Sequence, residues 1–369
     1  MKIAAVALHR YRLPLCADWR TAGGGFAWRE GWLLRLDAAG GARAYGDCAP
    51  LPMSGTETLA AAEPALQALA RRLVGKSASD ALATLDRRSA CRTPAARCAV
   101  ETALLDLLAQ ASGCSLAACL HDGWASADPP PKRSTVAVNA ALGSVGEVSE
   151  TAILEACREG FQVLKLKVGI AGVRREIDHL WRLADLLPKG IWLRLDANRA
   201  WRFSDASRFL QSCVGLPVEM LEEPLAKARL DRLQSLQAGT PLAIAVDEST
   251  AFLDLERLLR RCSVRRLVIK PARAGGLLAA RALARRATRA GLECVVTSNL
   301  DSACGVLAAA HLAAAIDNHL AHGLATSTWL KRDTGPRPAI AHGRLWLPDT
   351  PGLGFVPGSE IVFAPLDLC

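Results

Sequence analysis

The sequence predicts a parallel (β/α) barrel joined to a second, smaller domain, and three observations lead to this fold class. The chain has 369 residues, which is more than one ordinary domain. Its second half alternates short apolar runs with stretches of helical periodicity, as βαβ units do. Five charged residues recur near the ends of these runs at steps of roughly 23 to 29 residues, the length of one strand plus one return helix. They are Lys167, Asp196, Glu222, Asp247 and Lys270.

Eight apolar runs are expected to form the barrel strands, because each is short, strand-like and separated from the next by a helical stretch. The last run is weaker than the others. The runs are Thr135–Leu142, Phe161–Val168, Ile191–Ala197, Val218–Leu221, Leu242–Val246, Val264–Ile269, Glu293–Thr297 and His319–Leu324.

The helical stretches carry their own signals. Ser204 is expected to cap the helix that follows it, and Gly291 is expected to end the helix before the seventh strand. A proline-rich stretch at residues 128–131 is the expected linker between the two domains. One apolar face with helical spacing is marked by Val173, Ile177, Leu180, Trp181, Ala184 and Leu187.

Composition argues against several classes of protein. The net charge of +9 comes from arginines scattered as pairs, without a basic tail or many aromatic residues, so no nucleic-acid partner is expected. No segment reaches the roughly 20 apolar residues of a membrane span, and no secretory signal is seen, so we expect a cytoplasmic protein without a membrane partner. The cysteines mostly lie in apolar runs and are expected to be free thiols.

The acidic members of the charged set come from consecutive strands, so their carboxylates are expected to meet at the carboxyl ends of those strands. Hard oxygen ligands favour Mg²⁺, with Mn²⁺ as the alternative ion. The competing interpretation is that these carboxylates pair with arginines of the barrel. The candidate metal ligands are Asp196, Glu222 and Asp247, and the neighbours expected to support them are Asn198, Glu223 and Glu248.

Three lysines lie inside or directly after apolar strand runs, although lysine is scarce in this arginine-dominated chain. An unpaired ammonium group would be costly there, so a surface role is a weak interpretation. Lys165 and Lys167 share one side of their strand, whereas Lys270 comes from four strands away around the barrel. Lys167 and Lys270 are therefore expected to face each other across the metal. A lysine placed there can remove a proton from the carbon next to a carboxylate while the metal stabilises the enediolate, with Lys165 as a neighbouring cation.

The charged residues lie in five short motifs: Lys165-Leu166-Lys167, Asp196-Ala197-Asn198, Glu222-Glu223-Pro224, Asp247-Glu248-Ser249 and Ile269-Lys270-Pro271. On these motifs, the chain resembles the muconate-lactonizing enzyme subgroup of the enolase superfamily. Within this subgroup it most resembles the o-succinylbenzoate synthase family, through residues 50–52, 57–58, 297–302 and 323–326. Two positions depart from the family pattern: Asp47 stands where a glutamate is usual, and Cys304 where many relatives have a small aliphatic residue or serine.

The resemblance implies a modified, TIM-like (β/α)7β barrel covered by an α+β capping domain that is built from both ends of the chain. The cap would span residues 1–130, the barrel 131–330, and a C-terminal segment, 331–369, would return to the cap. The implied activity is Mg²⁺-dependent syn-dehydration of a cyclohexadiene carboxylate to o-succinylbenzoate, a step of menaquinone synthesis. Family members also commonly form homo-oligomers.

The resemblance further implies roles for individual residues toward a small-molecule carboxylate substrate. Lys167 would take the α-proton and protonate the departing hydroxyl, and Lys270 would stabilise the enediolate electrostatically. A loop after the seventh strand would bind the distal carboxylate of the substrate, with an ordinary strand-to-helix turn as the alternative. The candidate residues of this loop are Ser298, Asn299, Leu300 and Asp301.

Other functions stay open at this point. An N-acylamino acid racemase or dipeptide epimerase would use the same metal and both lysines as alternating acid and base, and a muconate-type cycloisomerase shares the first half-reaction. A catalytically silent barrel would be expected to lack one of the lysines or carboxylates. The glycine-rich segment Arg20–Arg29 is expected either to close over the site as a lid or to form an ordinary surface loop.

Overall fold

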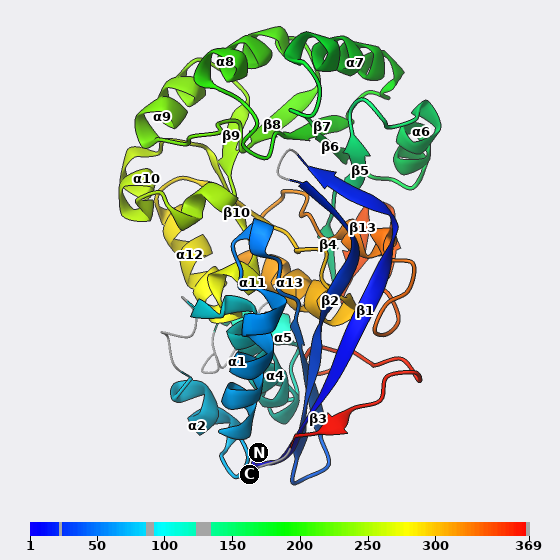
Figure 1. Ribbon diagram of the computed structural model, residues 1–369, viewed down its shortest axis with the longest axis vertical. Helices are drawn as coiled ribbons and strands as arrows, with labels where there is room; N and C mark the ends of the chain where they lie inside the picture. Colours follow the sequence, from blue (N-terminus) through cyan, green and yellow to red (C-terminus); the bar gives the residue numbers. More distant parts are fainter. Residues whose placement is uncertain (22–23, 86–91, 123–133, 367–369) are drawn as a thin grey trace.

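The computed structural model describes residues 1–21, 24–85, 92–122 and 134–366, and it shows a barrel and an α+β cap (Figure 1). The N-terminal region builds the cap, and a strand near the C-terminus returns to it. The predicted (β/α) barrel with a capping domain is thus confirmed. The predicted linker at residues 128–131 lies outside the described residues.

A 7-stranded sheet of parallel strands forms the barrel, in the order β11-β10-β9-β8-β7-β6-β5. The weak eighth run lies in the expected place, but it supplies two isolated parallel bridges rather than a regular strand. In these bridges His322 pairs with Val138, and Gly323 pairs with Thr297, which joins the two edges of the sheet. The strands are β5 (Ala140–Ser144), β6 (Val163–Lys167), β7 (Trp192–Asp196), β8 (Val218–Glu222), β9 (Ala243–Val246), β10 (Arg266–Ile269) and β11 (Glu293–Val296).

The first predicted run, residues 135–142, divides into two strands that belong to different sheets. β4 (Thr135–Ala137) pairs antiparallel with β13 (Arg344–Trp346), which also pairs with β12 (Ile340–Ala341). Only β5 enters the barrel sheet. The pattern of the run could not show this division, because the partner strand β13 lies far along the chain.

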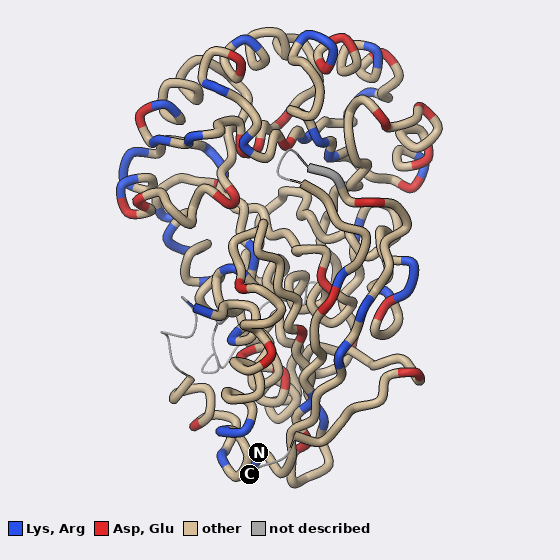
Figure 2. Tube along the Cα trace, viewed as in Figure 1, with Lys and Arg blue, Asp and Glu red and all other residues tan. Residues whose placement is uncertain are grey.

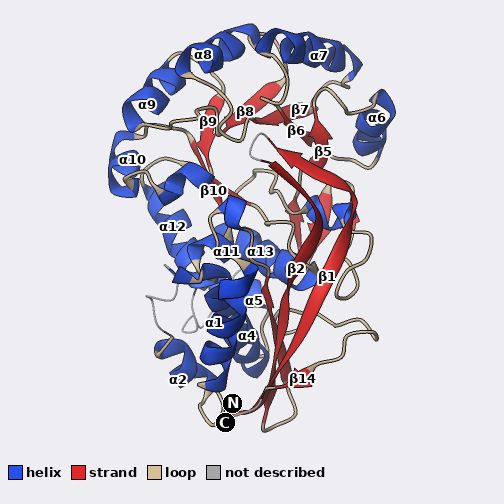
Figure 3. Ribbon diagram, in the orientation of Figure 1, coloured by secondary structure: helices blue, strands red, loops and turns tan. Residues whose placement is uncertain are grey.

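Helices cover the outer face of the barrel sheet (Figure 3). Their apolar faces pack on the strands, as Leu180 and Leu183 of α7 illustrate by their burial. The helices are α6 (Glu150–Arg158), α7 (Val173–Leu186), α8 (Phe203–Ser212), α9 (Leu230–Ala238), α10 (Leu255–Arg261), α11 (Pro271–Ala274), α12 (Leu277–Arg289) and α13 (Ala303–Ile316), with the short 3-10 helices η2 (Glu248–Ala251) and η3 (Ala325–Trp329).

Two helical expectations are wrong in detail and one is confirmed. Trp181 does not belong to the buried face of α7, since it is 45% exposed. Ser204 is not an N-cap, because α8 begins one residue earlier and Arg202 takes the cap position without a side-chain hydrogen bond. Gly291 follows the end of α12 with a left-handed φ of 83°, as expected of a helix stop.

The cap consists of a sheet in the order β14-β1-β2-β3 with helices packed against it. Gly46 of β3 lies so close to α4 that an added Cβ would stand 1.9 Å from the carbonyl oxygen of Ala99, which requires glycine there. The elements are β1 (Ile3–Thr21), β2 (Gly24–Ala38), β3 (Arg43–Cys48), η1 (Pro52–Ser54), α1 (Leu59–Arg71), α2 (Ala78–Ala83), α4 (Pro94–Ala111), α5 (Leu116–Asp122) and β14 (Ala364–Pro365).

Strands β1 and β2 form a long hairpin whose end reaches the barrel (Figure 1). The described part of the segment Arg20–Arg29 belongs to these strands, so the expectation of a loop is wrong for it. Trp19 pairs with Phe26 across the hairpin. The rings of Trp19 and of Trp329 in η3 pack in a T-shaped arrangement, with 4.8 Å between their centroids. This aromatic contact joins the hairpin to the barrel.

A chain of ion pairs occupies the barrel interior near the first residues of the strands. Arg194, which is 1% exposed, lies 2.6 Å from Glu219 and donates to Asn139 Oδ1 at 3.1 Å. Arg266 lies 2.7 Å from both Glu219 and Glu293. These two arginines pair with carboxylates other than the candidate metal ligands, whereas Arg273 pairs with Asp247, as the competing interpretation expects.

The surface and the cysteines agree with the composition. Basic and acidic residues alternate along the outer helices (Figure 2). Every cysteine that the structure describes is a free thiol, and only Cys16 and Cys262 among them are exposed. None of the described helices combines the length and the apolar character that a bilayer crossing requires.

We predict that His311 makes folding sensitive to acid. Its Nδ1 accepts from the Ala117 N–H at 3.1 Å and its Nε2 donates to the Leu353 carbonyl at 3.0 Å, and burial lowers its pKa to about 4. The unfolded chain therefore binds the proton more readily, since an unfolded histidine has a pKa of about 6.5. The free energy of unfolding should fall by about 2 kcal/mol from this residue between pH 7 and pH 5, measured by urea titration.

His311→Gln should remove that part of the pH dependence, because an amide can accept and donate without titrating in this range. The matched control is His319→Gln, at an exposed histidine. An unchanged pH dependence in His311→Gln would show that His311 does not contribute.

Candidate functional site

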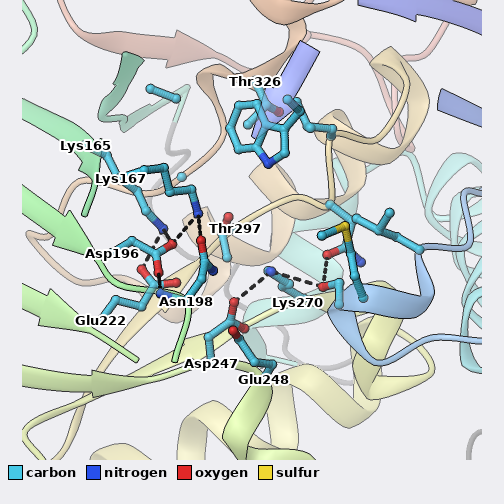
Figure 4. Close-up of a pocket in the computed structure, with 18 of the residues that line it drawn as sticks. Lys165, Lys167, Asp196, Asn198, Glu222, Asp247, Glu248, Lys270, Thr297 and Thr326 are labelled. Atoms are coloured by element: carbon cyan, nitrogen blue, oxygen red, sulfur yellow. Dashed lines mark hydrogen bonds and ion pairs between the residues drawn. The ribbon is translucent and has the colours of Figure 1, made fainter. Parts of the chain in front are cut away.

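The five residues of the charged set all reach one cavity at the carboxyl ends of the barrel strands. Lys167 pairs in register with Asp196, and Asp196 with Glu222, so these residues form one row across β6, β7 and β8. Asp247 and Lys270 directly follow β9 and β10. All five line a cavity of about 810 Å³ (Figure 4). They therefore converge as their spacing predicts.

Two lysines of β6 lie against two carboxylates on one side of the cavity. Lys165 Nζ lies 2.6 Å from Glu222 Oε2 and 2.9 Å from Asp196 Oδ2. Lys167 Nζ donates to Asp196 Oδ2 at 2.6 Å and to Asn198 Oδ1 at 2.7 Å. Burial opposes ionisation of Asp196, but the two ammonium groups outweigh burial and lower its pKa. For Lys165, burial is likewise outweighed by Asp196 and Glu222, which raise its pKa, so Lys165 stays charged at neutral pH.

A third lysine approaches from the opposite side of the cavity (Figure 4). Lys270 Nζ lies 2.7 Å from Asp247 Oδ2 and donates to Ser54 Oγ at 3.1 Å. Arg273 donates to Asp247 Oδ1 at 2.5 Å. Burial opposes ionisation of Asp247, but Arg273 and Lys270 outweigh it and lower its pKa. Lys167 and Lys270 thus face one space from two sides.

The residues expected to support the carboxylates have different surroundings. Glu223 is 1% exposed and accepts from the N–H groups of Asp247 at 2.6 Å and Ser249 at 2.8 Å, so it fixes the backbone that carries Asp247. Burial raises the pKa of Glu223 to about 7. Glu248 lines the cavity instead, and burial, followed by the charge of Asp247, raises its pKa to about 8. Asn198 and Glu223 both adopt left-handed φ values, 41° and 47°.

The candidate metal ligands do not form a ready metal site. Among the described residues, no three histidine, cysteine, aspartate or glutamate side chains are arranged to hold an ion, and lysine ammonium groups lie against the same oxygens. The donor chemistry nevertheless fits a hard divalent cation. Burial, followed by the charge of Asp196 and then of Asp247, raises the pKa of Glu222, so a cation between these groups would relieve repulsion. The metal role of the three carboxylates stays a prediction.

The loop after β11 forms a further wall of the cavity. Ser298, Asn299 and Leu300 line the cavity, whereas Asp301 is not among its lining residues. Asp301 accepts from the Asn299 N–H at 3.2 Å, and burial raises its pKa to about 6. Leu300 has a left-handed φ of 56°, and its carbonyl accepts from Arg29 of the cap at 3.1 Å. The structure therefore gives Asp301 a contact within the loop and brings the other three residues to the cavity.

The two departures from the family pattern lie away from the cavity. Asp47 accepts from the Tyr11 hydroxyl at 2.7 Å and from the backbone N–H and hydroxyl of Ser302 at 3.0 and 2.8 Å. This carboxylate joins the cap to the loop after β11. Cys304 is fully buried in α13.

Several residues that complete the cavity were not among the candidate site residues. Trp19 and Phe26 come from the hairpin end, Ser54 from η1 and Thr326 from η3. The ring centroid of Trp19 lies 5.7 Å from Lys167 Nζ, within the range of a cation–π contact. The tryptophans beside the glycine-rich segment were the available signal for the hairpin residues. No repeating sequence pattern identifies Ser54, because its position at the site depends on how the cap docks on the barrel.

Two family models match this chain. One, described as "Enolase C-terminal domain-like", matches residues 149–361, and the other, described as "MenC, N-terminal domain", matches residues 3–87. The first match covers more than half of the chain and contains the strands that carry the lysines and carboxylates.

Individual proteins are similar over most of the chain. The L-Ala-D/L-Glu epimerase of Bacillus subtilis (strain 168) is 29% identical over 367 residues, which cover 96% of this chain and 97% of that protein. A chloromuconate cycloisomerase of Cupriavidus pinatubonensis (strain JMP 134 / LMG 1197) is 31% identical over 66% of this chain and 65% of its own length. A solved dipeptide epimerase of Methylococcus capsulatus, complexed with Mg and L-Arg-D-Lys, superposes with a TM-score of 0.84 at 27% identity, covering 96% and 99% of the two chains.

The motifs, the barrel with its cap and these matches agree, so the family prediction is confirmed at the level of the superfamily. The matches do not distinguish an o-succinylbenzoate synthase from an epimerase or a cycloisomerase. This protein belongs to the enolase superfamily and is an enzyme.

Proposed function

We propose that this protein moves a proton on and off the carbon next to a carboxylate, as a racemase or epimerase of N-acylated amino acids, a class that includes dipeptides. One observation carries the proposal: two lysines flank one cavity, Lys167 beside Asp196 and Lys270 beside Asp247. Inversion at a carbon needs one group to take the proton from one face and a second group to return a proton to the other. The similarity to dipeptide epimerases supports this choice.

Each lysine has a distinct task in this reaction. Lys165 stays an ammonium group, because Asp196 and Glu222 outweigh burial and raise its pKa, and it would face the substrate carboxylate. Lys167 takes the proton: the Cα–H bond breaks, its electron pair spreads into the carboxylate as an enediolate, and the proton forms a new N–H bond. Lys270, as an ammonium group, gives a proton to the opposite face of the carbon. The two roles exchange for the other epimer.

We propose Mg²⁺ as the cofactor, held by Asp196, Glu222 and Asp247. The bound ion would neutralise the negative charge that develops on the substrate carboxylate. The oxygen-only donor set supports this choice, and so does the Mg in the structure of the Methylococcus capsulatus relative. Mn²⁺ stays an expectation from ligand chemistry.

A second candidate is syn-dehydration of a succinyl-bearing cyclohexadiene carboxylate to o-succinylbenzoate. The match of residues 3–87 to the "MenC, N-terminal domain" model favours it. In that reaction Lys167 would act as both base and acid, whereas Lys270 would only stabilise charge. Both candidates take a small carboxylate substrate. The expected homo-oligomer and the cytoplasmic location stay predictions.

We predict that the two lysines serve opposite epimers. The probes are L-Ala-L-Glu and L-Ala-D-Glu, and N-succinyl-L-phenylalanine and its D enantiomer, incubated with Mg²⁺ in D₂O. The wild-type enzyme should exchange the α-hydrogen of both members of one pair, measured by NMR. Lys167→Ala should lower exchange of one epimer by about 100-fold or more and Lys270→Ala that of the other, because each epimer presents its α-hydrogen to one lysine.

The control for these variants is Lys189→Ala, at an exposed lysine after α7, which should behave as wild type. Absence of α-hydrogen exchange from both probe pairs in the wild-type enzyme would contradict the racemase proposal. Release of an aromatic product from the cyclohexadiene carboxylate, followed by ultraviolet absorbance and retained in Lys270→Arg, would support the second candidate instead.

We also predict that Asp196→Asn weakens Mg²⁺ binding by at least about tenfold, because the amide removes one negative charge from the candidate ligand set. Isothermal titration calorimetry measures this affinity without a substrate. Asp185→Asn, at an exposed position of α7, is the matched control. Equal Mg²⁺ affinity in the wild-type protein and in Asp196→Asn would remove Asp196 from the ligand set.

A further inference from the structure

The two lysines that flank the cavity have matching sets of partners. Lys167 Nζ contacts one carboxylate oxygen, of Asp196 at 2.6 Å, and one neutral acceptor, Asn198 Oδ1 at 2.7 Å. Lys270 Nζ also contacts one carboxylate oxygen, of Asp247 at 2.7 Å (Figure 4). Its neutral acceptor is Ser54 Oγ at 3.1 Å. Asn198 belongs to the barrel, whereas Ser54 belongs to η1 of the cap.

The hydroxyl hydrogen of Ser54 is already used in another contact. Ser54 Oγ donates to Asn299 Oδ1 at 2.6 Å, and a serine hydroxyl has only one hydrogen. Ser54 therefore acts as an acceptor toward Lys270 and does not donate to the lone pair of a neutral Lys270 amine. The side chain of Ser54 is itself held in place, because the residue is 5% exposed and its N–H donates to the Leu51 carbonyl at 2.8 Å.

These contacts leave one direction around Lys270 Nζ open for a hydrogen or a lone pair. The Nζ atom is tetrahedral, with Cε in one direction and three further directions for hydrogens or a lone pair. Asp247 takes one of these directions and Ser54 takes the second. The third is left for the substrate, because Nζ lies at the wall of the cavity.

We propose that Ser54 is a positioning residue for Lys270, so that the cap supplies a hydrogen-bond partner to the base for one face of the substrate, whereas the hydrogen-bond partners of the base for the other face come from the barrel. This inference rests on the proposed racemase or epimerase function. When Lys270 acts as the base, the Cα–H bond breaks, its electron pair stays on the substrate, and the proton becomes the third N–H of the Lys270 ammonium group. The hydrogen bonds of Lys167 go to side chains of β7 and of the loop after it, and the cap meets this lysine through the ring of Trp19.

The test compares exchange of the two epimers in D₂O in one variant. Ser54→Ala should lower exchange of the epimer that depends on Lys270 by about tenfold, through kcat rather than KM, and change exchange of the other epimer by less than about twofold. Ser54→Thr, which keeps the hydroxyl, should recover most of the lost rate. Asn198→Ala is the matched variant in the barrel, and it should lower exchange of the opposite epimer.

The outcomes distinguish positioning of Lys270 by Ser54 from other roles of this residue. Equal loss for both epimers in Ser54→Ala would overturn the inference, since that is expected if Ser54 only binds substrate or only supports the fold. No loss for either epimer would overturn it as well. If the wild-type enzyme exchanges neither epimer of either probe pair, the proposed function fails and the inference falls with it.

Thermal unfolding and Mg²⁺ titration of Ser54→Ala should match the wild type. If that variant does not fold, Ser54→Cys replaces it in the same comparison, and the same difference between the two epimers is expected.

Discussion

The site depends on one constraint: carboxylates that are almost completely buried must be neutralised by cations placed next to them. Asp196, Glu222 and Asp247 are each 1 to 2% exposed, and an unpaired charge at such a depth would destabilise the fold by several kcal/mol. The strand register meets this need, because it sets Lys167 beside Asp196 and Asp196 beside Glu222 in one row. The side chains that the fold needs for neutrality are therefore also the ones available for moving protons.

The barrel interior contains two charged layers with different sets of cations. The lower layer joins Arg194 and Arg266 to Glu219, whereas the upper layer joins three lysines, together with Arg273, to Asp196, Glu222 and Asp247. Arginine keeps its proton at any physiological pH and forms fixed, forked contacts, which suits a layer that only holds strands together. Lysine can give up a proton when its surroundings favour the amine, and the lysines occupy the layer that is open to the cavity. Asn139 contacts Arg194 below and lines the cavity above, so it connects the two layers.

The sequence was informative where charged residues recur at an even spacing, or where a residue type would be energetically costly in apolar surroundings. The even spacing from Lys167 to Lys270 predicted a common rim, and the placement of lysines in apolar runs argued against a surface role for them. Prediction failed where partners come from distant parts of the chain. The split of residues 135–142 depends on β13, and the strands of segment Arg20–Arg29 depend on pairing across a hairpin, which a glycine cluster can accompany as well as a loop. Ser54 was missed for the same reason, because its partners at the site, Lys270 and Asn299, follow more than two hundred residues later.

A division of labour between barrel and cap would explain how similar chains can carry out different reactions. Removing a proton and returning it to the same face needs one oriented base, whereas inversion needs two. If the hydrogen bonds that direct Lys167 come from the barrel and one of those that direct Lys270 comes from the cap, substitutions in η1 would change the second base without touching a barrel strand. The loop after β11 would follow such a change, since Asn299 accepts from Ser54 and Leu300 is held by Arg29 of the cap. On this proposal, the docking of the cap would bear on the choice between one-base and two-base chemistry as well as on the shape of the cavity.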